Sequence, residues 1–398
     1  MPSESHALRS TDSERRDAVP TRPALLTTAF LQEILGGDTV VSGFEWQALE
    51  TGVISEVVAV RVFLESASGA REKQLVAKFL RPEFPFESMF LVESKFYASF
   101  GGAGATSVPF ELPVPVFTSN VLIVLERVPS VETHTCLQGC PASRIAALVA
   151  KLAQFHARLW RHDCDGLSEP AGIGSNLSGE AKKEQFPGLW TAYLDDIPLE
   201  RGDRSRLAAL CEHLSANADL LQRTHELVDS GPQTLIHGDY HVANILFPSS
   251  SRNGGGSAVA ADERVWLLDW ATCGKGNPMR DLAFFFIVSV TERDRREHEQ
   301  RSLELYCSTV RSELAAGTPA AADLSLADWT RWYKVCVLNQ FLILVVYDHL
   351  SKHLAANAKT EKLRAELDAH FRAVNLRACL SVIDNLGDNV ADLEALLK

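Results

Sequence analysis

Three features that would mark particular protein classes are missing from this 398-residue sequence. It has no excess of positive charge, since its net charge is -12, which argues against nucleic acid or an anionic membrane as a partner. It has no apolar run long enough to span a bilayer, because Asn339 and Gln340 interrupt the longest run, 335–347. Its first two dozen residues lack the apolar segment of a signal peptide. The sequence therefore predicts neither a nucleic-acid nor a membrane partner.

Cysteine pairs of the C-x-x-C type are also missing, so a structural zinc site is not indicated. The eight cysteines are scattered without a dense framework, which predicts reduced thiols in a cytoplasmic protein. They lie at positions 136, 140, 164, 211, 273, 307, 336 and 379. Hydrophobic residues make up 46% of the chain, enough for one two-lobed unit or two domains.

What the sequence does contain is the segment LIHGDYHVANILF, residues 235–247, which reads H-x-D-x-x-x-x-N. Phosphoryl transfer needs a carboxylate beside the attacking hydroxyl and an amide that helps to hold Mg²⁺, and kinases place the two five positions apart in one loop. Asp239 and Asn244 have that spacing, with His237 two residues before the aspartate. The apolar flanks predict short buried strands that hold both ends of the loop.

A second segment, Val265–Trp270, is an apolar run that ends in Asp269 and a tryptophan. Kinases place their second Mg²⁺ carboxylate in such a position, after the catalytic loop and a hairpin. Asn244 and Asp269 are therefore the candidate metal ligands. Between the two segments, residues 248–262 are rich in glycine and serine and predict a flexible insertion at a hairpin tip.

Together the two segments resemble the aminoglycoside phosphotransferase and choline kinase family, in which H-G-D-x-x-x-x-N forms the catalytic loop and D-W replaces D-F-G. Other residues of the chain resemble the ecdysteroid kinase-like branch of this family: Glu93, Phe96, Tyr97, Leu152, Ala153, His156, Ala157, Trp160, Gly276, Asp281, Leu282 and Ala283. The resemblance implies an α+β, protein-kinase-like fold of two lobes, ATP and Mg²⁺ as cofactors, and a small-molecule hydroxyl acceptor as partner.

The predicted organisation follows the chain. Residues 1–24 are polar and predict a disordered tail. Residues 25–127 predict a nucleotide-binding lobe, with an antiparallel sheet and a helix over 88–100. In this lobe, the spacing of apolar residues predicts a helix over 25–35. Two strands are expected within 50–64, with a turn near 54–56. Residues 128–398 predict a mainly helical, catalytic and acceptor-binding lobe.

The candidate nucleotide-binding residues lie in the first lobe. Lys78 stands in the apolar strand 74–80, where a lysine is costly without a partner. The resemblance implies that Lys78 holds the ATP phosphates and pairs with Glu93. Only Gly52 is available where kinases lay a glycine-rich hairpin over the phosphates, so G-x-G-x-x-G is absent. After the strand 121–125, Glu126 and Val128 lie where the resemblance implies a hinge whose backbone meets adenine.

The remaining roles concern the second lobe. Asp239 is expected to accept the proton of the acceptor hydroxyl. The resemblance implies that Asp281 bonds the backbone of the catalytic loop, and His237 is expected to tie that loop to the strand before Asp269. His156 is expected to be a packed core histidine. His241 either lines the acceptor pocket or caps the loop.

Three alternatives remain beside a small-molecule kinase. A metallohydrolase would use His237, Asp239, His241 and Asp269 as a metal cluster, but it leaves Lys78 and Asn244 without roles. A kinase-like module could bind nucleotide without turnover, although the complete set of motif residues argues against it. A protein kinase would need an A-P-E-like segment after the D-W pair, and none is present. ATP or GTP as donor, the acceptor itself and the oligomeric state stay open.

Overall fold

The computed structural model describes residues 19–37, 39–49, 55–66, 69–81, 87–101, 108–160, 167, 180–249, 264–314, 324–358, 360–387 and 390–398. The chain forms two compact units, the first made of Met1–Ala105 and Leu112–Pro129, and the second of Thr106–Glu111 and Ser130–Lys398. Gly52, most of the expected tail and nearly all of the expected insertion lie outside the described residues.

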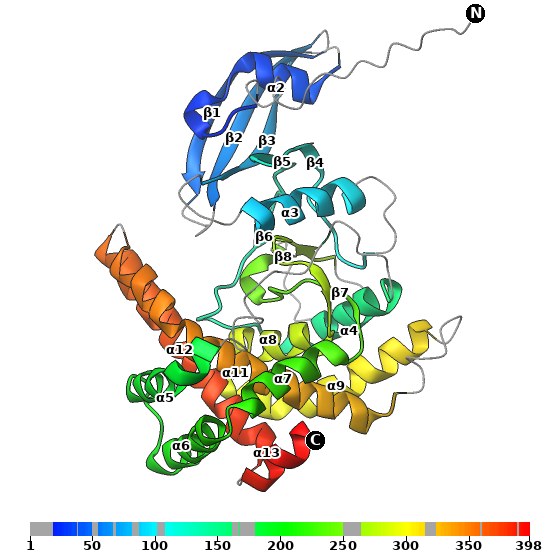
Figure 1. The fold of residues 1–398 in the computed structure, drawn as a ribbon. Helices are drawn as coiled ribbons and strands as arrows, with labels where there is room; N and C mark the ends of the chain where they lie inside the picture. The colour runs from blue at the N-terminus through cyan, green and yellow to red at the C-terminus, as the bar shows by residue number, and fades with distance from the viewer. Residues whose placement is uncertain are drawn as a thin grey trace, which may run out of the picture. The chain divides into compact units, whose positions relative to one another are not determined.

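The first unit is built on one five-stranded antiparallel sheet with the strand order β1-β2-β3-β5-β4 (Figure 1). The strands are β1 (Val40–Leu49), β2 (Ser55–Ser66), β3 (Gly69–Leu80), β4 (Pro115–Thr118) and β5 (Leu122–Glu126). Buried and partly exposed residues alternate along the middle of β2 and the second half of β3, because successive side chains of a strand point to opposite faces. One face of the sheet therefore forms a core.

Helix α2 (Thr28–Leu35) covers that buried face. Thr27 caps the helix, since its hydroxyl accepts a hydrogen bond from the amide of Phe30 at 3.1 Å. The core between helix and sheet includes Leu26, Phe30, Leu31, Val58, Val60, Val62, Leu75, Ala77, Phe79, Leu122 and Val124. Each large apolar side chain of this kind contributes about 1.5–3 kcal/mol when it is fully buried. This packing fixes the sheet, and with it the side chains on its other face.

Two sequence-based predictions about this unit are wrong in detail. The helix expected from residue 25 begins at Thr28, after a separate 3₁₀ turn over Pro23–Leu25. The two strands expected within 50–64 are one strand, β2, and its hairpin partner β1 precedes that segment. As an edge strand, β1 leaves Trp46 44% exposed and Val40 60% exposed. It therefore lacks the clear apolar alternation by which a half-buried strand is recognised.

The second unit is mainly helical. Its helices are α4 (Ala142–Arg158), α5 (Glu180–Asp195), α6 (Arg201–Ala216), α7 (Asp219–Ser230), α8 (Met279–Ser289), α9 (Glu292–Leu314), α11 (Leu326–Ala356), α12 (Glu361–Leu386) and α13 (Val390–Leu397). Figure 1 shows most of them gathered below the short strands of this unit, with α4 beside β7. The antiparallel sheet of the first unit and this helical unit confirm the predicted α+β fold class.

Helix α11 runs through the interior of the second unit. Its length and composition alone would allow it to cross a membrane, but 61% of its most apolar window is buried, and α8 and α12 pack against it. A core helix passes the same test of length and composition. The seven cysteines among the described residues are all buried, and none of them forms a disulfide.

Short strands frame the predicted catalytic loop. β7 (Thr234–Ile236) pairs with β10 (Gly274–Gly276), and β8 (Ile245–Pro248) pairs with both β6 (Val131–Glu132) and β9 (Trp266–Leu267). Every residue of β7 and the first three of β8 are buried. The buried strands predicted on either side of the loop are therefore present, and β8 and β9 form the expected hairpin.

Candidate functional site

The first unit brings Lys78 and Glu93 together. Lys78 lies on β3 and Glu93 on α3 (Glu87–Phe100), and the lysine Nζ is 2.5 Å from a glutamate Oε. The Glu93 side chain is 3% exposed and that of Lys78 17% exposed. A buried carboxylate without a partner would be costly, so the lysine compensates its charge. The pairing expected from the motifs is present.

The surroundings of Lys78 differ from the buried face of the same sheet. Strand register places Lys78 opposite Val57 and Ile123, and Val76 lies two residues along on the same face. Val57 and Val76 are only half-buried, whereas Phe79, on the face covered by α2, is fully buried. Ile123 is fully buried, so the lysine lies beside one buried isoleucine and two valines that remain partly accessible, a surface that suits a flat apolar ring next to a charged group.

The expected hinge residues follow β5. The amide of Glu126 donates to the carbonyl of Val114 at 2.8 Å, and its carboxylate lies 2.6 Å from Lys73 Nζ. Val128 follows two residues later and is half-buried. The structure thus places Glu126 and Val128 at the end of the strand that adjoins β3, within the same unit as Lys78.

In the second unit, Gly238 allows the catalytic loop to turn. Its φ of +81° lies in the left-handed region that side chains disfavour. A Cβ atom at this position would lie 2.3 Å from the carbonyl oxygen of Thr272, so any other residue would force the backbone apart. The glycine in H-G-D is therefore required by close backbone packing as well as by its φ.

The backbone of this loop is held by Asp281 from α8. The carboxylate accepts hydrogen bonds from the amides of His237 at 2.7 Å and Gly238 at 2.8 Å, as the resemblance implied. Burial acts to raise the pKa of Asp281, but hydrogen bonds from His156 and the His237 amide, with the nearby imidazoles, outweigh it and the pKa is lowered. Asp281 is thus ionised at neutral pH and can accept both amides.

His237 holds the loop from the other side. Its Nε2 lies 2.9 Å from the carbonyl oxygen of Leu268, and its Nδ1 is 3.2 Å from the amide of Asp239. Burial lowers the pKa of His237, so the ring is neutral, with the proton on Nε2 and a lone pair on Nδ1 toward the amide. His237 therefore connects the catalytic loop to the residue before Asp269, as expected from the sequence.

Asp239 and Asn244 are in direct contact. The Asn244 amide nitrogen donates to Asp239 Oδ2 and to the Asp239 carbonyl oxygen, both at 3.1 Å. His241 Nε2 is 3.3 Å from the same Oδ2, a contact that the sequence did not suggest. The Asp239 side chain is still 33% exposed and so can be reached by a substrate. The three residues form one polar group on the loop.

The charges of this group are coupled. Burial acts to raise the pKa of Asp239, but the charge and hydrogen bond of His241, together with His237 and Asn244, lower it to about 2. Burial likewise acts to lower the pKa of His241, yet Asp239 raises it well above its usual value. At neutral pH the pair is therefore a carboxylate and an imidazolium.

Asp269 lies two residues after the end of β9 and adopts a φ of +61°, a conformation that non-glycine residues rarely take. The amide of the preceding Leu268 donates to the carbonyl of Asn244 at 2.9 Å, which brings Asp269 next to the loop residue 25 positions earlier. Because the Asn244 amide nitrogen is turned toward Asp239, its oxygen is the atom left for a metal. An amide oxygen and a carboxylate are the hard oxygen ligands that suit Mg²⁺.

The rival metal cluster is not formed. Within the part of the chain that the structure describes, no three His, Cys, Asp or Glu side chains are arranged to hold a metal ion. His237, one of its four proposed ligands, instead uses both ring nitrogens for backbone contacts.

Sequence reasoning missed two residues that support the loop. The Thr272 hydroxyl donates to the His237 carbonyl at 3.0 Å. Tyr306, on α9, places its hydroxyl 2.8 Å from Nδ1 of His156. His156 is fully buried, as expected, and its Nε2 also contacts Asp281 at 3.1 Å. Thr272 lies three residues after Asp269 and two after the end of the Val265–Trp270 segment, so its closeness to that segment was the available signal. Tyr306 lies 150 residues from His156, and no local pattern marks it.

Comparison with known proteins agrees with the motifs. Residues 136–316 match the sequence model of the ecdysteroid kinase-like family. This match confirms the predicted resemblance to kinases that act on small molecules and the prediction of a kinase-type enzyme. No curated protein matches the chain.

Several solved structures are similar to this chain at low identity. A macrolide 2'-phosphotransferase from Brachybacterium faecium is 14% identical, with 82% of this chain and 91% of that chain covered and a TM-score of 0.40. An amicoumacin kinase is 12% identical, with 92% and 96% covered and a TM-score of 0.46. A choline/ethanolamine kinase family protein from Mesorhizobium loti is 12% identical, with 93% and 98% covered and a TM-score of 0.41.

Proposed function

We propose that this chain, which matches the ecdysteroid kinase-like family over residues 136–316, is a phosphotransferase that moves the γ-phosphoryl group of ATP to a hydroxyl of a small molecule. The observation that carries the proposal is the contact between Asp239 and Asn244 in a loop whose backbone is tied to Leu268, next to Asp269. One carboxylate is thereby available for the hydroxyl, while an amide oxygen and a second carboxylate are available for Mg²⁺.

Asp239 would act on the acceptor. A pKa of about 2 keeps it ionised, so it orients the hydroxyl by accepting its hydrogen bond and takes the proton late, as the new bond forms. The acceptor oxygen bonds to the γ-phosphorus while the bond from that phosphorus to the β–γ bridging oxygen breaks. ADP leaves, and the proton passes from Asp239 to solvent. The His241 contact would keep the carboxylate ionised and in one orientation.

The remaining residues would hold the nucleotide. Lys78, fixed by Glu93, would bind the α- and β-phosphates. The half-buried apolar side chains beside Lys78 would contact the adenine ring, with the backbone at Glu126 and Val128 beside it. Gly52 is proposed to cover the phosphates. Asn244 and Asp269 would hold Mg²⁺, which offsets the negative charge of the β- and γ-phosphates when it is bound.

The test separates the two carboxylates. We expect Asp239→Asn to keep ATP affinity in calorimetry and to lower turnover by about 10²-fold or more, the scale of a positioned general base. We expect Asp269→Ala to lose Mg²⁺-dependent ATP binding and turnover with the fold retained. Turnover is measured as ADP release across a broad panel of small-molecule alcohols.

Asp229→Asn serves as the control, because this carboxylate of the same unit is 60% exposed and pairs only with His225 among the described contacts. It should match the wild type in both assays. Loss of ATP binding in a folded Asp239→Asn protein would make Asp239 a metal ligand and contradict the assigned roles. ATP binding by the wild type without transfer to any member of the panel would favour a binding module.

A further inference from the structure

The catalytic loop ends in a short 3₁₀ turn, Val242–Asn244, whose last residue is the proposed metal ligand. The amide of Asn244 donates to the carbonyl of His241 at 3.0 Å and closes the turn. The first amides of a helical turn have no acceptor inside it, so their acceptor must come from elsewhere. Val242 is 0% exposed, so solvent does not reach its amide. A group of the protein must therefore accept it.

That group is the hydroxyl of Ser289, the last residue of α8. The Val242 amide donates to Ser289 Oγ at 2.8 Å, across 47 positions of the chain. A capping acceptor commonly comes from the residue just before the turn, here His241, but its side chain makes no capping bond. Its Nε2 lies 3.3 Å from Asp239 Oδ2 instead. Ser289 thus caps the turn in place of His241 and leaves that imidazole to Asp239.

Ser289 is one of three α8 residues that hold the loop. Asp281 accepts the amide of Gly238 at 2.8 Å, and the ring of Phe285 packs on that of Tyr240 with centroids 5.5 Å apart. The hydroxyl of Ser289 then holds the turn. Residues four apart lie on the same face of a helix. A single face of α8 therefore holds both halves of the loop, the first through Asp281 and the second through Ser289.

The end of α8 is itself fixed in the second unit. Ser289 is 0% exposed, and its carbonyl accepts the amide of Cys140 at 2.6 Å. The carbonyl of Val288 accepts a hydrogen bond from the guanidinium of Arg377, on α12, at 3.0 Å. Both bonds occupy carbonyls that the last turn of a helix leaves without a partner inside the helix. The Ser289 hydroxyl therefore has a defined position from which it can hold the turn.

We propose that Ser289 is a positioning residue for the phosphoryl transfer proposed above, whose hydroxyl caps the turn so that Asn244 and His241 stay in contact with Asp239. Without the hydroxyl, the buried Val242 amide has no acceptor, and a buried donor without a partner is costly. The turn relieves this cost by moving toward another acceptor or toward solvent. Asn244, at the other end of the turn, moves with it and away from the carboxylate.

The test removes one oxygen atom. Ser289→Ala is compared with Ser381→Ala on α12 of the same unit. Ser381 is also 0% exposed, but its hydroxyl has no hydrogen-bond partner among the described residues, so its removal should change little. Should Ser289→Ala fail to fold, Ser289→Thr and Ser289→Val replace it, since the two side chains have the same shape and only threonine keeps the hydroxyl. Equal behaviour of that pair in the measurements below would contradict the proposal.

The first measurement does not depend on activity. Hydrogen exchange of the Val242 backbone amide is followed by NMR in the full chain labelled with ¹⁵N-valine, with the signal assigned by Val242→Ile. We expect slow exchange in the wild type and in Ser381→Ala, and about tenfold faster exchange in Ser289→Ala, as the loss of one hydrogen bond implies. The buried valine amides of α11 should keep their rates, because the change is local. Unchanged Val242 exchange in Ser289→Ala would overturn the proposal.

The second measurement is kinetic and rests on the proposed function. With the alcohol that gives the fastest turnover, Ser289→Ala should lower the kcat of ADP release about tenfold, because misplacement of a reacting group by a fraction of an ångström has effects of this order. The KM for ATP at saturating Mg²⁺ should stay within about twofold, since Lys78 and Glu93 of the first unit keep their pair. Equal kcat values for Ser289→Ala and Ser381→Ala would contradict the positioning role.

The two measurements separate the two ways in which the proposal can fail. A wild type that transfers phosphate to no alcohol would overturn the proposed function, and the positioning role with it, even if the Val242 amide exchanges as expected. An active wild type whose Val242 amide exchanges as fast as an exposed amide would overturn the cap alone and leave the proposed function standing.

Discussion

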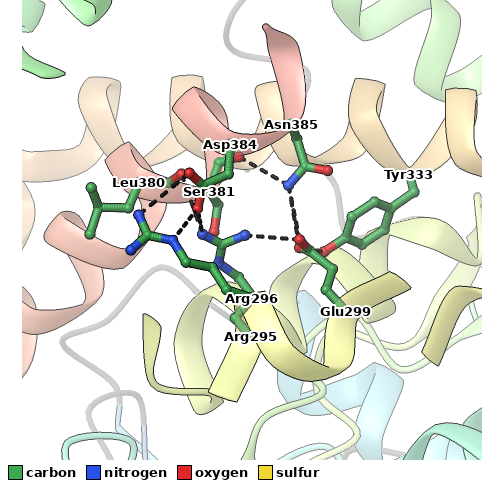
Figure 2. Close-up of polar contacts among 8 residues, drawn as sticks. All are labelled: Arg295, Arg296, Glu299, Tyr333, Leu380, Ser381, Asp384 and Asn385. Carbon is green, nitrogen blue, oxygen red and sulfur yellow. Dashed lines mark hydrogen bonds and ion pairs between the residues drawn. The ribbon is translucent and has the colours of Figure 1, made fainter. Parts of the chain in front are cut away.

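Replacing Arg295 by methionine should destabilise the second unit far more than the same change at its neighbour Arg296. Arg295 lies on α9, where its side chain is 1% exposed, and it contacts Glu299 at 2.8 Å and also Asp384 of α12. Figure 2 shows both arginines directed at the same carboxylate. Arg296 reaches Asp384 at 2.8 Å from a side chain that is 53% exposed. The two residues share a partner and differ in burial.

The size of the effect follows from what each change leaves behind. Methionine at 295 leaves Glu299, 13% exposed, without its cation, although the Tyr333 hydroxyl and Asn385 still donate to it. Breaking a buried ion pair by removing one partner costs about 3–5 kcal/mol, and the remaining donors place this case near 3 kcal/mol. Arg296→Met removes a surface pair, which is worth about 0–1 kcal/mol.

Thermal unfolding followed by circular dichroism measures the difference. For a unit of this size, about 3 kcal/mol corresponds to a Tm lower by roughly 5 °C, against about 2 °C or less for Arg296→Met. Urea midpoints at unchanged m-value provide the independent check. Equal shifts for the two variants would refute the argument that burial, and not the number of contacts, decides the energy of this network.

Two further predictions concern the ion pairs. Lys78→Met should lower ATP affinity at least tenfold in calorimetry. Lys73 lies on the same strand but pairs with Glu126 at a half-exposed site, so Lys73→Met should leave ATP affinity unchanged. Equal affinities of the two variants would exclude the phosphate-binding role of Lys78. Burial acts to raise the pKa of Asp384, but hydrogen bonds from both arginines lower it, so its ionisation stabilises the folded state above the unfolded pKa of about 3.9. Urea unfolding should therefore show Asp384→Asn less stable than the wild type at pH 7, with the gap closing as pH falls below about 4.

Much of the candidate site could be predicted from the sequence because its chemistry is local. Asp239 and Asn244 touch across five positions of one loop, and Gly238 supplies the turn immediately before Asp239. The pairing of Lys78 with Glu93 was also predicted, since a lysine in a buried strand needs a carboxylate and the motif order offers one on the next helix. Edge strand β1 escaped prediction because its exposed residues follow no apolar period.

Residue order alone thus determined the α+β class, the short strands around the loop, and which acidic, amide and basic side chains are available for chemistry. Only the tertiary structure decided which distant groups hold them. The Tyr306–His156 bond spans 150 positions and the Arg295–Asp384 pair spans 89. Periodicity and motif spacing report only on neighbours within a few turns of chain, whereas these partners meet because helix packing brings buried polar groups together, and burial then makes each bond necessary.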